Sequence, residues 1–161
     1  MQKFRIVEIP PMKVVTSRPI TSPEVQNAFC AWWTGYDRCV PGKLTPRDFM
    51  MYNTKTQHTE WMYALPIPDI SDDHGGYEVK EYPFGLYAVS SCLDGDCDQA
   101  ADWLATRAEI MDWVRQTGCF AVSEDDGEED RYTMFHIVTP SIVMEKLHIH
   151  IQDMYVPIRV K

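Results

Sequence analysis

The sequence has few basic residues, and they do not cluster. Lysine and arginine number 15 against 24 aspartates and glutamates, which gives a formal net charge of −9. A nucleic acid backbone is recognised by clustered lysine and arginine side chains. The sequence therefore disfavours direct nucleic acid binding, and its charge also opposes attraction to an anionic membrane surface.

Cysteine pairs with metal-ligand spacing are missing as well. The five cysteines are odd in number and include no CxxC pair, which disfavours both a disulfide framework and a zinc site. We expect free thiols in a reducing cytoplasm, no metal and no cofactor. Cys92 and Cys97 flank LDGD and are the pair that could join if oxidised.

Long apolar runs are also absent near the start of the chain. Residues 1–20 contain charged side chains at Lys3, Arg5, Glu8, Lys13 and Arg18. We therefore expect neither a signal peptide nor a membrane span. With 161 residues, 45% hydrophobic and 24% charged, the chain is typical of a soluble globular protein. We expect one cytoplasmic domain over residues 1–161.

The strand and helix signals in the sequence occur in the same order in the two halves of the chain. Residues 3–18 and 77–92 each predict a long strand, interrupted at Pro10-Pro11 in the first and at Pro83-Phe84-Gly85 in the second. A helix is predicted after each strand, from Pro23 to a stop at Gly35 and from Cys97 to Gly118. The second helix has a predicted apolar stripe of Ala100, Leu104, Met111 and Val114.

Further strands follow each helix. Residues 47–53 and 59–67 predict a hairpin, and residues 131–140 and 146–161 predict two more strands separated from the second helix by an acidic loop at 124–130. The order β-α-β-β therefore occurs twice. It indicates an α+β fold, a pseudo-twofold duplication of a βαββ unit with halves at about 1–76 and 77–161. We expect antiparallel sheets, two packed helices and a central ligand groove between the halves.

Four segments in this order resemble one known family. They are VEIPPMKVV (7–15), YEVKEYPFGLYAVSS (77–91), MDWVRQTG (111–118) and QDMYVPI (152–158). Together they resemble the GyrI-like small-molecule-binding domains, also called AraC-type effector-binding domains, over nearly the whole chain. The resemblance implies two βαββ halves with a ligand groove, here in a stand-alone form. Relatives of that form include drug-sequestering proteins, small protein inhibitors and a branch that hydrolyses strained electrophiles.

The sequence also departs from the pattern of this family at two positions. The family carries a glutamate followed two residues later by a tyrosine on the strand after the second helix. The segment RYTMFHI (131–137) places Met134 and His136 at those positions, so we expect no carboxylate there and a neutral, adaptable pocket. Ligand-binding residues are predicted on strands that resemble the family's groove-lining strands and on the first helix: Trp33, Tyr52, Trp61, Tyr63, Tyr87, Met134, His136 and Tyr155. Aromatic walls of this kind stack on flat apolar or cationic ligands, although ordinary sheet packing would also explain them.

Other chemistry has weaker support in the sequence. His148 and His150 are predicted to share one strand face, where a solvated surface explains them more simply than a metal site with His136. Glu60 and Glu81 are expected to be exposed, so no catalytic residue is assigned. Of the adjacent Trp32 and Trp33, one is expected in the core and the other outside it or in the groove.

The function that the sequence favours is binding of a small apolar or aromatic molecule, with a cationic ligand left open, in a sensor or sequestering role. Two alternatives remain at this point. One is a hydrolase of reactive small molecules, which requires a buried carboxylate in the groove. The other is a protein–protein inhibitor. An enzyme is the less favoured interpretation.

Overall fold

The computed structural model describes residues 3–42, 47–93, 103–123 and 131–161. The chain divides into two compact units, one of Pro10–Pro83 and one of Met1–Ile9 together with Phe84–Lys161. We call them the N-terminal unit and the C-terminal unit. The expectations for Cys97, Ala100 and the acidic run 124–130 lie outside the described residues.

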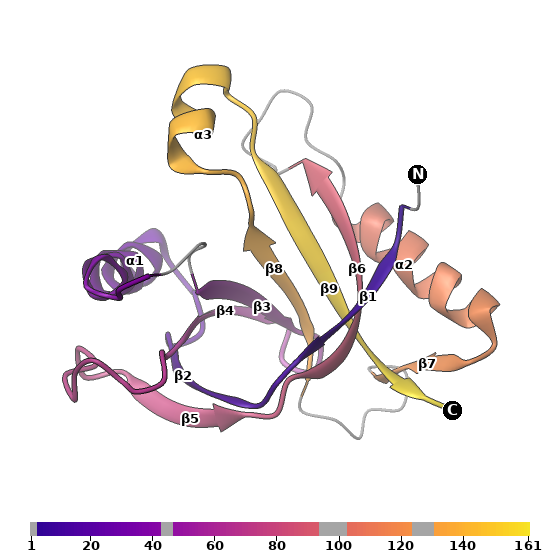
Figure 1. Ribbon diagram of the computed structural model, residues 1–161, viewed down its shortest axis with the longest axis horizontal. Coiled ribbons are helices and arrows are strands. Elements are labelled where there is room, and N and C mark those ends of the chain that lie inside the picture. Colours follow the sequence, from indigo (N-terminus) through magenta and orange to yellow (C-terminus); the bar gives the residue numbers. More distant parts are fainter. Residues whose placement is uncertain (1–2, 43–46, 94–102, 124–130) are drawn as a thin grey trace. The chain divides into compact units, whose positions relative to one another are not determined.

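The N-terminal unit is an antiparallel sheet with one helix. Its strands follow the order β3-β4-β2-β5 across the sheet (Figure 1). The elements are β2 (Met12–Thr16), α1 (Pro23–Arg38), β3 (Asp48–Asn53), β4 (His58–Ala64) and β5 (Glu78–Tyr82). The predicted hairpin is confirmed, because β3 pairs with β4 from Asp48 opposite Tyr63 to Asn53 opposite His58.

The C-terminal unit has the same kind of architecture with more elements. Strands β1, β6, β9 and β8 are neighbours in that order, and β7 also pairs with β9 (Figure 1). The elements are β1 (Arg5–Ile9), β6 (Gly85–Leu93), α2 (Trp103–Thr117), β7 (Phe120–Val122), β8 (Thr133–Ile137), α3 (Ser141–Leu147) and β9 (Ile151–Val160). The predicted α+β class, with helices packed against antiparallel sheet, is confirmed.

The proline breaks separate the two units. The first predicted long strand is β1 and β2, divided at Pro10-Pro11, and the second is β5 and β6, divided at Pro83-Phe84. In both cases the chain passes from one unit to the other at the break. Proline lacks the N–H that a continuous ladder needs, so each break is a place where the strand can change partners.

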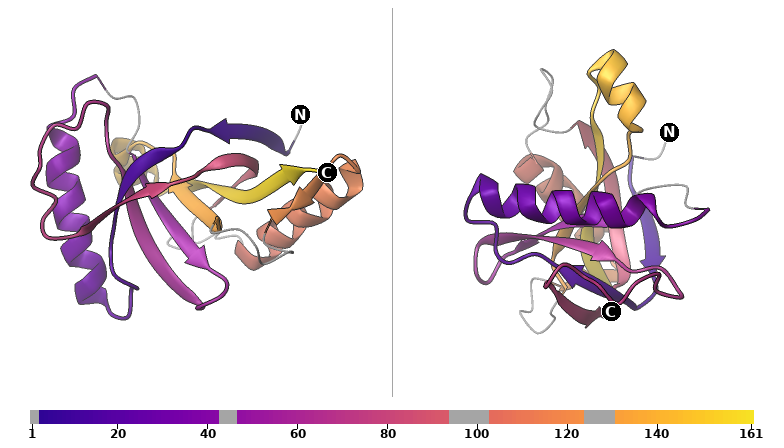
Figure 2. Two further views of the ribbon diagram at one scale, coloured as in Figure 1. Left: turned by 90° about the horizontal axis from the view of Figure 1, so that it is seen from below. Right: turned by 90° about the vertical axis from the view of Figure 1, so that its left-hand side faces the viewer.

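Helix α1 packs an aromatic face on the sheet of the N-terminal unit. It begins at Pro23 after the N-cap Ser22 and ends at Arg38, so the predicted stop at Gly35 is wrong (Figure 2). The last turn is retained because it buries Tyr36 and Asp37. A glycine costs only about 1 kcal/mol in a helix interior, which such packing outweighs.

The core of this unit lies between α1 and the sheet. It contains Val15, Phe29, Tyr36, Val40, Tyr63 and Leu65, with Trp32, Trp33, Trp61 and Tyr77 packed against them. Trp32 and Trp33 therefore both pack on the core, whereas only one of them was expected to do so. The two indoles contact different sides of one layer, since Trp32 meets Phe29 and Tyr77 while Trp33 meets Trp61.

Helix α2 packs on the sheet of the C-terminal unit and ends at Gly118 as predicted, where φ is +71°. Its buried residues are Thr106, Ile110 and Val114. Leu104 is 55% exposed, so its place in the predicted apolar stripe is wrong. The stripe instead passes through Ile110, which lies four residues from both Thr106 and Val114.

Helix α3 was not predicted. The segment 146–161 was expected to be a strand, but Lys146 and Leu147 end α3, and His148 follows in the left-handed region with φ +52°. Strand β9 begins only at Ile151. His148 and His150 therefore do not share a strand face, and that prediction is wrong. Among the described residues, no helix is long and apolar enough to cross a membrane.

Candidate functional site

The sheet of the C-terminal unit has one face covered by α2 and one face that α2 does not cover. The covered face is defined by a core cluster in which Ala88 of β6 and Met154, Val156 and Ile158 of β9 pack with Ile110 of α2. Neighbouring residues along a strand point to opposite sides of the sheet. The odd-numbered residues of β6 and β9 therefore lie on the other side, which we call the helix-free face.

Four predicted ligand-binding residues lie together on the helix-free face. Tyr87 belongs to it by alternation with Ala88, and Tyr155 by alternation with Met154 and Val156. In β8, Met134 is directly opposite Tyr155 and His136 is directly opposite Asp153. Residues directly opposite one another in an antiparallel pair share a face. The predicted strand register, with Met134 and His136 on one side, is thus that of the structure.

Aromatic contacts connect β6 and β9 on this face. The rings of Tyr87 and Tyr155 meet edge to face, with centroids 6.1 Å apart and an interplanar angle of 83°. The guanidinium of Arg131 lies 5.7 Å from the centroid of the Tyr87 ring. This distance is within the range of a cation–π contact. Arg131 precedes β8 and was not recognised as part of the face from the sequence.

Arg131 is a buried cation held by carbonyl and hydroxyl oxygens. Its Nη1 donates to the Leu86 carbonyl at 3.2 Å, and its Nη2 donates to Ser123 Oγ and to the Ile158 carbonyl, both at 3.2 Å. The guanidinium lies against Gly85, where a Cβ would be 2.6 Å from Nη1. Gly85 has φ +116°, a value that favours glycine. The glycine of the strand break thus makes room for the arginine that contacts Tyr87.

A carboxylate lies on the helix-free face, a question that the sequence left open. Asp153 of β9 is opposite His136, and its side chain is only 9% exposed. It forms an ion pair with Arg5 of β1 and accepts a hydrogen bond from Ser91 Oγ at 2.6 Å. Strand β8 itself carries no acid between Thr133 and Ile137, as predicted. The acid comes from the neighbouring strand β9, outside the segment 131–137 to which the expectation applied.

The environment of Tyr155 raises the pKa of its phenol. Burial raises its pKa, and the negative charge of Asp153 raises it further while Arg5 opposes the shift, so that the pKa of Tyr155 is about 12. Desolvation and a nearby anion both disfavour the phenolate. At neutral pH the face therefore presents a protonated Tyr155 hydroxyl beside a compensated carboxylate.

The other four predicted residues belong to the N-terminal unit and lie between α1 and its sheet. The Trp33 ring is 5.7 Å from that of Trp61 and is stacked on Tyr63, with centroids 6.1 Å apart and an interplanar angle of 21°. Tyr52 is opposite Thr59, two residues before Trp61, so it lies on the same side of the sheet. These positions are those of helix-facing packing.

Two of the rings in this layer donate hydrogen bonds to carboxylates. Tyr63 is fully buried and its hydroxyl donates to Asp37 Oδ1 at 2.8 Å, while Trp61 Nε1 donates to Asp48 Oδ2 at 2.9 Å. Burial raises the pKa of Tyr63. Trp33 Nε1 is buried without a hydrogen-bond partner among the described residues. The layer is therefore a packed aromatic core with two buried or half-buried carboxylates that orient its rings.

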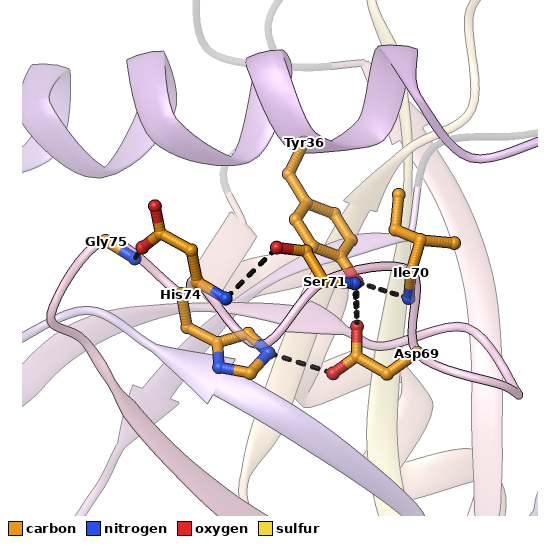
Figure 3. Close-up of polar contacts among 7 residues, drawn as sticks. Tyr36, Asp69, Ile70, Ser71, His74 and Gly75 are labelled. Atoms are coloured by element: carbon orange, nitrogen blue, oxygen red, sulfur yellow. Dashed lines mark hydrogen bonds and ion pairs between the residues drawn. The ribbon is translucent and has the colours of Figure 1, made fainter.

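A third polar cluster ties the loop before β5 to α1 (Figure 3). The Tyr36 hydroxyl donates to Asp69 Oδ1, and His74 Nε2 lies 2.9 Å from Asp69 Oδ2. The Ile70 N–H donates to the Tyr36 oxygen at 3.3 Å. Burial and the bond to Asp69 raise the pKa of Tyr36 to about 12. Burial would raise the pKa of Asp69, but hydrogen bonds from Tyr36 and His74 outweigh it and lower that pKa.

The remaining candidates do not form a catalytic or metal site in the described part of the chain. Glu60 is half-buried, with 18% of its side chain exposed, and lies 3.9 Å from Lys80 Nζ. Glu81 is exposed, as expected. No group of three histidine, cysteine, aspartate or glutamate side chains among the described residues could hold a metal ion.

Comparison with known proteins identifies the fold. No protein-family model matches the chain, and no curated protein matches it significantly. Solved structures do match: the EcmrR C-terminal domain has a TM-score of 0.62 at 12% identity, with 97% of this chain and 96% of that chain covered. A hydrolase from Listeria innocua has a TM-score of 0.57 at 11% identity, with 98% and 92% covered. SAV2435 bound to tetraphenylphosphonium has a TM-score of 0.52 at 12% identity, with 98% and 94% covered.

These similarities extend over almost the full length of each chain and concern the fold. The fold expected from the resemblance to GyrI-like domains is therefore confirmed: this chain folds like the EcmrR C-terminal domain and like SAV2435.

Proposed function

We propose that this protein binds a small, largely apolar or aromatic molecule on the helix-free face of the C-terminal unit, in a sensor or sequestering role. The observation that carries the proposal is the convergence of Tyr87, Met134, His136 and Tyr155 on one face that α2 does not cover. Tyr87 and Met134 are fully buried and His136 is 7% exposed, so a ligand would have to part these side chains, for which the flexible methionine is suited, while the phenol and imidazole supply a few polar groups.

The fold supports this proposal by analogy. SAV2435 has the same fold and was solved bound to tetraphenylphosphonium, a molecule with four aromatic rings. Such a fold can therefore hold a multi-ring organic compound. The analogy concerns the class of ligand, and the residues that would contact it here are those of the helix-free face.

The test compares two aromatic truncations on neighbouring strands. Tyr155→Ala removes a half-buried ring from the helix-free face, and Phe135→Ala removes a half-buried ring from the opposite face of β8. Binding of triphenylphosphine oxide, a neutral three-ring probe, is measured by isothermal titration calorimetry. We expect Tyr155→Ala to weaken binding about tenfold or more, and Phe135→Ala to change it less than about threefold.

Two results would reject the proposal. The first is equal loss in both variants, which would indicate a general effect on folding. The second is absence of binding by the unaltered protein across a panel of neutral and cationic multi-ring compounds.

A second candidate function is hydrolysis of a reactive small molecule. One observation favours it: Asp153, nearly buried, stands opposite His136 on the same face. A buried carboxylate within reach of bound substrate could act as a general base. If the wild-type protein opens a strained electrophile such as an aryl epoxide, Asp153→Asn should abolish turnover while retaining binding of the neutral probe. Absence of turnover by the wild type rejects this candidate.

A further inference from the structure

The charge around Asp153 on the helix-free face depends on one ion pair. Asp153 Oδ2 contacts Arg5 Nη2, Ser91 Oγ donates to Asp153 Oδ1 at 2.6 Å, and Arg5 Nη1 donates to Ser91 Oγ at 3.5 Å. The three residues come from the adjacent strands β9, β1 and β6. They form a closed triangle at the edge of the face, next to His136 and Tyr155.

The two charged partners differ in their access to water. The Asp153 side chain is 9% exposed, whereas the Arg5 side chain is 46% exposed. The Arg5 guanidinium would be hydrated if it rotated into solvent, so the cost of separating the pair falls on Asp153. Asp153 cannot follow, and a carboxylate left without a cation in a poorly solvated position is strongly disfavoured. The pair therefore behaves as a fixed anion with a removable cation.

The removable cation affects ligands according to their charge. A cationic ligand that approaches Asp153 must displace Arg5, which belongs to the same chain and already occupies the carboxylate. A neutral ligand on the tyrosine and methionine surface leaves the pair intact and meets no such competition. The Asp153 carboxylate is thus compensated by Arg5, although the chain as a whole carries a net charge of −9.

We propose that Arg5 is a specificity-determining residue of this face: by occupying Asp153 it directs binding toward neutral aromatic molecules and against cationic ones. This inference rests on the proposed function. It differs from the prediction made from the sequence, in which neutrality followed from the absence of an acid. Here an acid is present and the protein's own arginine compensates it.

The experiment measures two probes of similar shape and different charge, tetraphenylphosphonium and triphenylphosphine oxide, on wild type and Arg5→Gln. Glutamine removes the charge and retains hydrogen-bonding groups. We expect Arg5→Gln to increase the affinity for tetraphenylphosphonium by about tenfold or more, and to change the affinity for the oxide by less than about threefold. Adding Asp153→Asn to Arg5→Gln should abolish the gain, and Arg5→Lys should retain the selectivity of the wild type.

The matched control is Lys3→Gln. It changes the net charge by the same amount, close in sequence to Arg5, but Lys3 pairs with Glu109, and both of those side chains are more than half exposed. An equal gain for Lys3→Gln would show a general charge effect and overturn the proposal. Unchanged cation affinity in a folded Arg5→Gln, as judged by its binding of the oxide, would also overturn it. Failure of every form to bind either probe would instead reject the proposed function.

Discussion

Replacing Gly85 with alanine is expected to destabilise the C-terminal unit by about 2–5 kcal/mol. Gly85 begins β6 with φ +116°, and a Cβ at this position would lie 2.6 Å from Arg131 Nη1 and 3.4 Å from Cζ. The positive φ alone costs an L-residue about 1–3 kcal/mol. The alanine methyl group also requires the arginine to move.

Arg131 cannot move without losing contacts. It is 8% exposed, and its guanidinium donates to two carbonyls and a hydroxyl, each at 3.2 Å. Each hydrogen bond contributes about 0.5–1.5 kcal/mol, so the loss of one or two adds about 1–2 kcal/mol to the backbone strain. The displaced guanidinium would also lose its position over the Tyr87 ring.

The assay is urea unfolding followed by tryptophan fluorescence, with Gly118→Ala as the matched control. Gly118 has φ +71°, but a Cβ there meets nothing within 4 Å, so this change introduces backbone strain without a clash. We expect Gly85→Ala to cost at least about 1 kcal/mol more than Gly118→Ala, and the excess to shrink when Arg131→Met is added. Equal costs in the two glycine variants would refute the role assigned to Arg131.

Two further predictions concern tyrosine hydroxyls. Tyr63→Phe should lower the free energy of unfolding by about 1.5–3 kcal/mol in urea titration, because Asp37 loses a donor in a buried position; a change within error would show that the bond is energetically neutral. The pKa values of Tyr36 and Tyr155 are raised from 10.0 to about 12, so the stability linked to them is complete below pH 10 and is lost as pH rises toward 12. Ultraviolet titration of the folded protein should show tyrosines that ionise well above pH 10. Ionisation of all tyrosines near pH 10.0 would contradict the effect assigned to burial.

Much of the fold could be predicted because its signals are local. The Pro10-Pro11 and Pro83-Phe84-Gly85 breaks interrupt apolar alternation within a few residues, and the structure places the boundaries of its units there. The β3–β4 hairpin needs only two alternating segments and a short polar turn. Gly118 ends α2 for a similarly local reason, the left-handed backbone that it adopts.

The failures have a different origin. Gly35 lies inside α1 because tertiary contacts of Tyr36 and Asp37 outweigh the low helix propensity of glycine. No capping side chain marks the start of helix α3 in the sequence, since its N-cap is Pro140 and no side-chain hydrogen bond is formed there. The alternation of Leu147, Ile149 and Ile151 with the two histidines resembles one continuous strand, but Leu147 ends α3, residues 148–150 form a connection, and β9 begins only at Ile151.

Strand alternation could place candidate residues on a face, but not decide which face a helix covers. Met134 and His136 were correctly paired on one side of β8, and the structure leaves that side uncovered by α2. Trp61 and Tyr63 were paired by the same rule, yet their side of β4 faces α1. Both pairs have the same period in sequence, so only tertiary structure separates a candidate ligand face from an aromatic core.

The charge of a site is even harder to predict from local sequence patterns. Asp153 enters the helix-free face through the pairing of β8 with β9, and Arg5 compensates it from 148 residues away in the chain. Neither residue lies in the segment that suggested a neutral pocket. A strand without acids can therefore belong to a face that contains one, and that acid can be compensated by an arginine from another strand. On our proposal, the ligand preference of this face follows from the cation that occupies Asp153, which in this chain is Arg5.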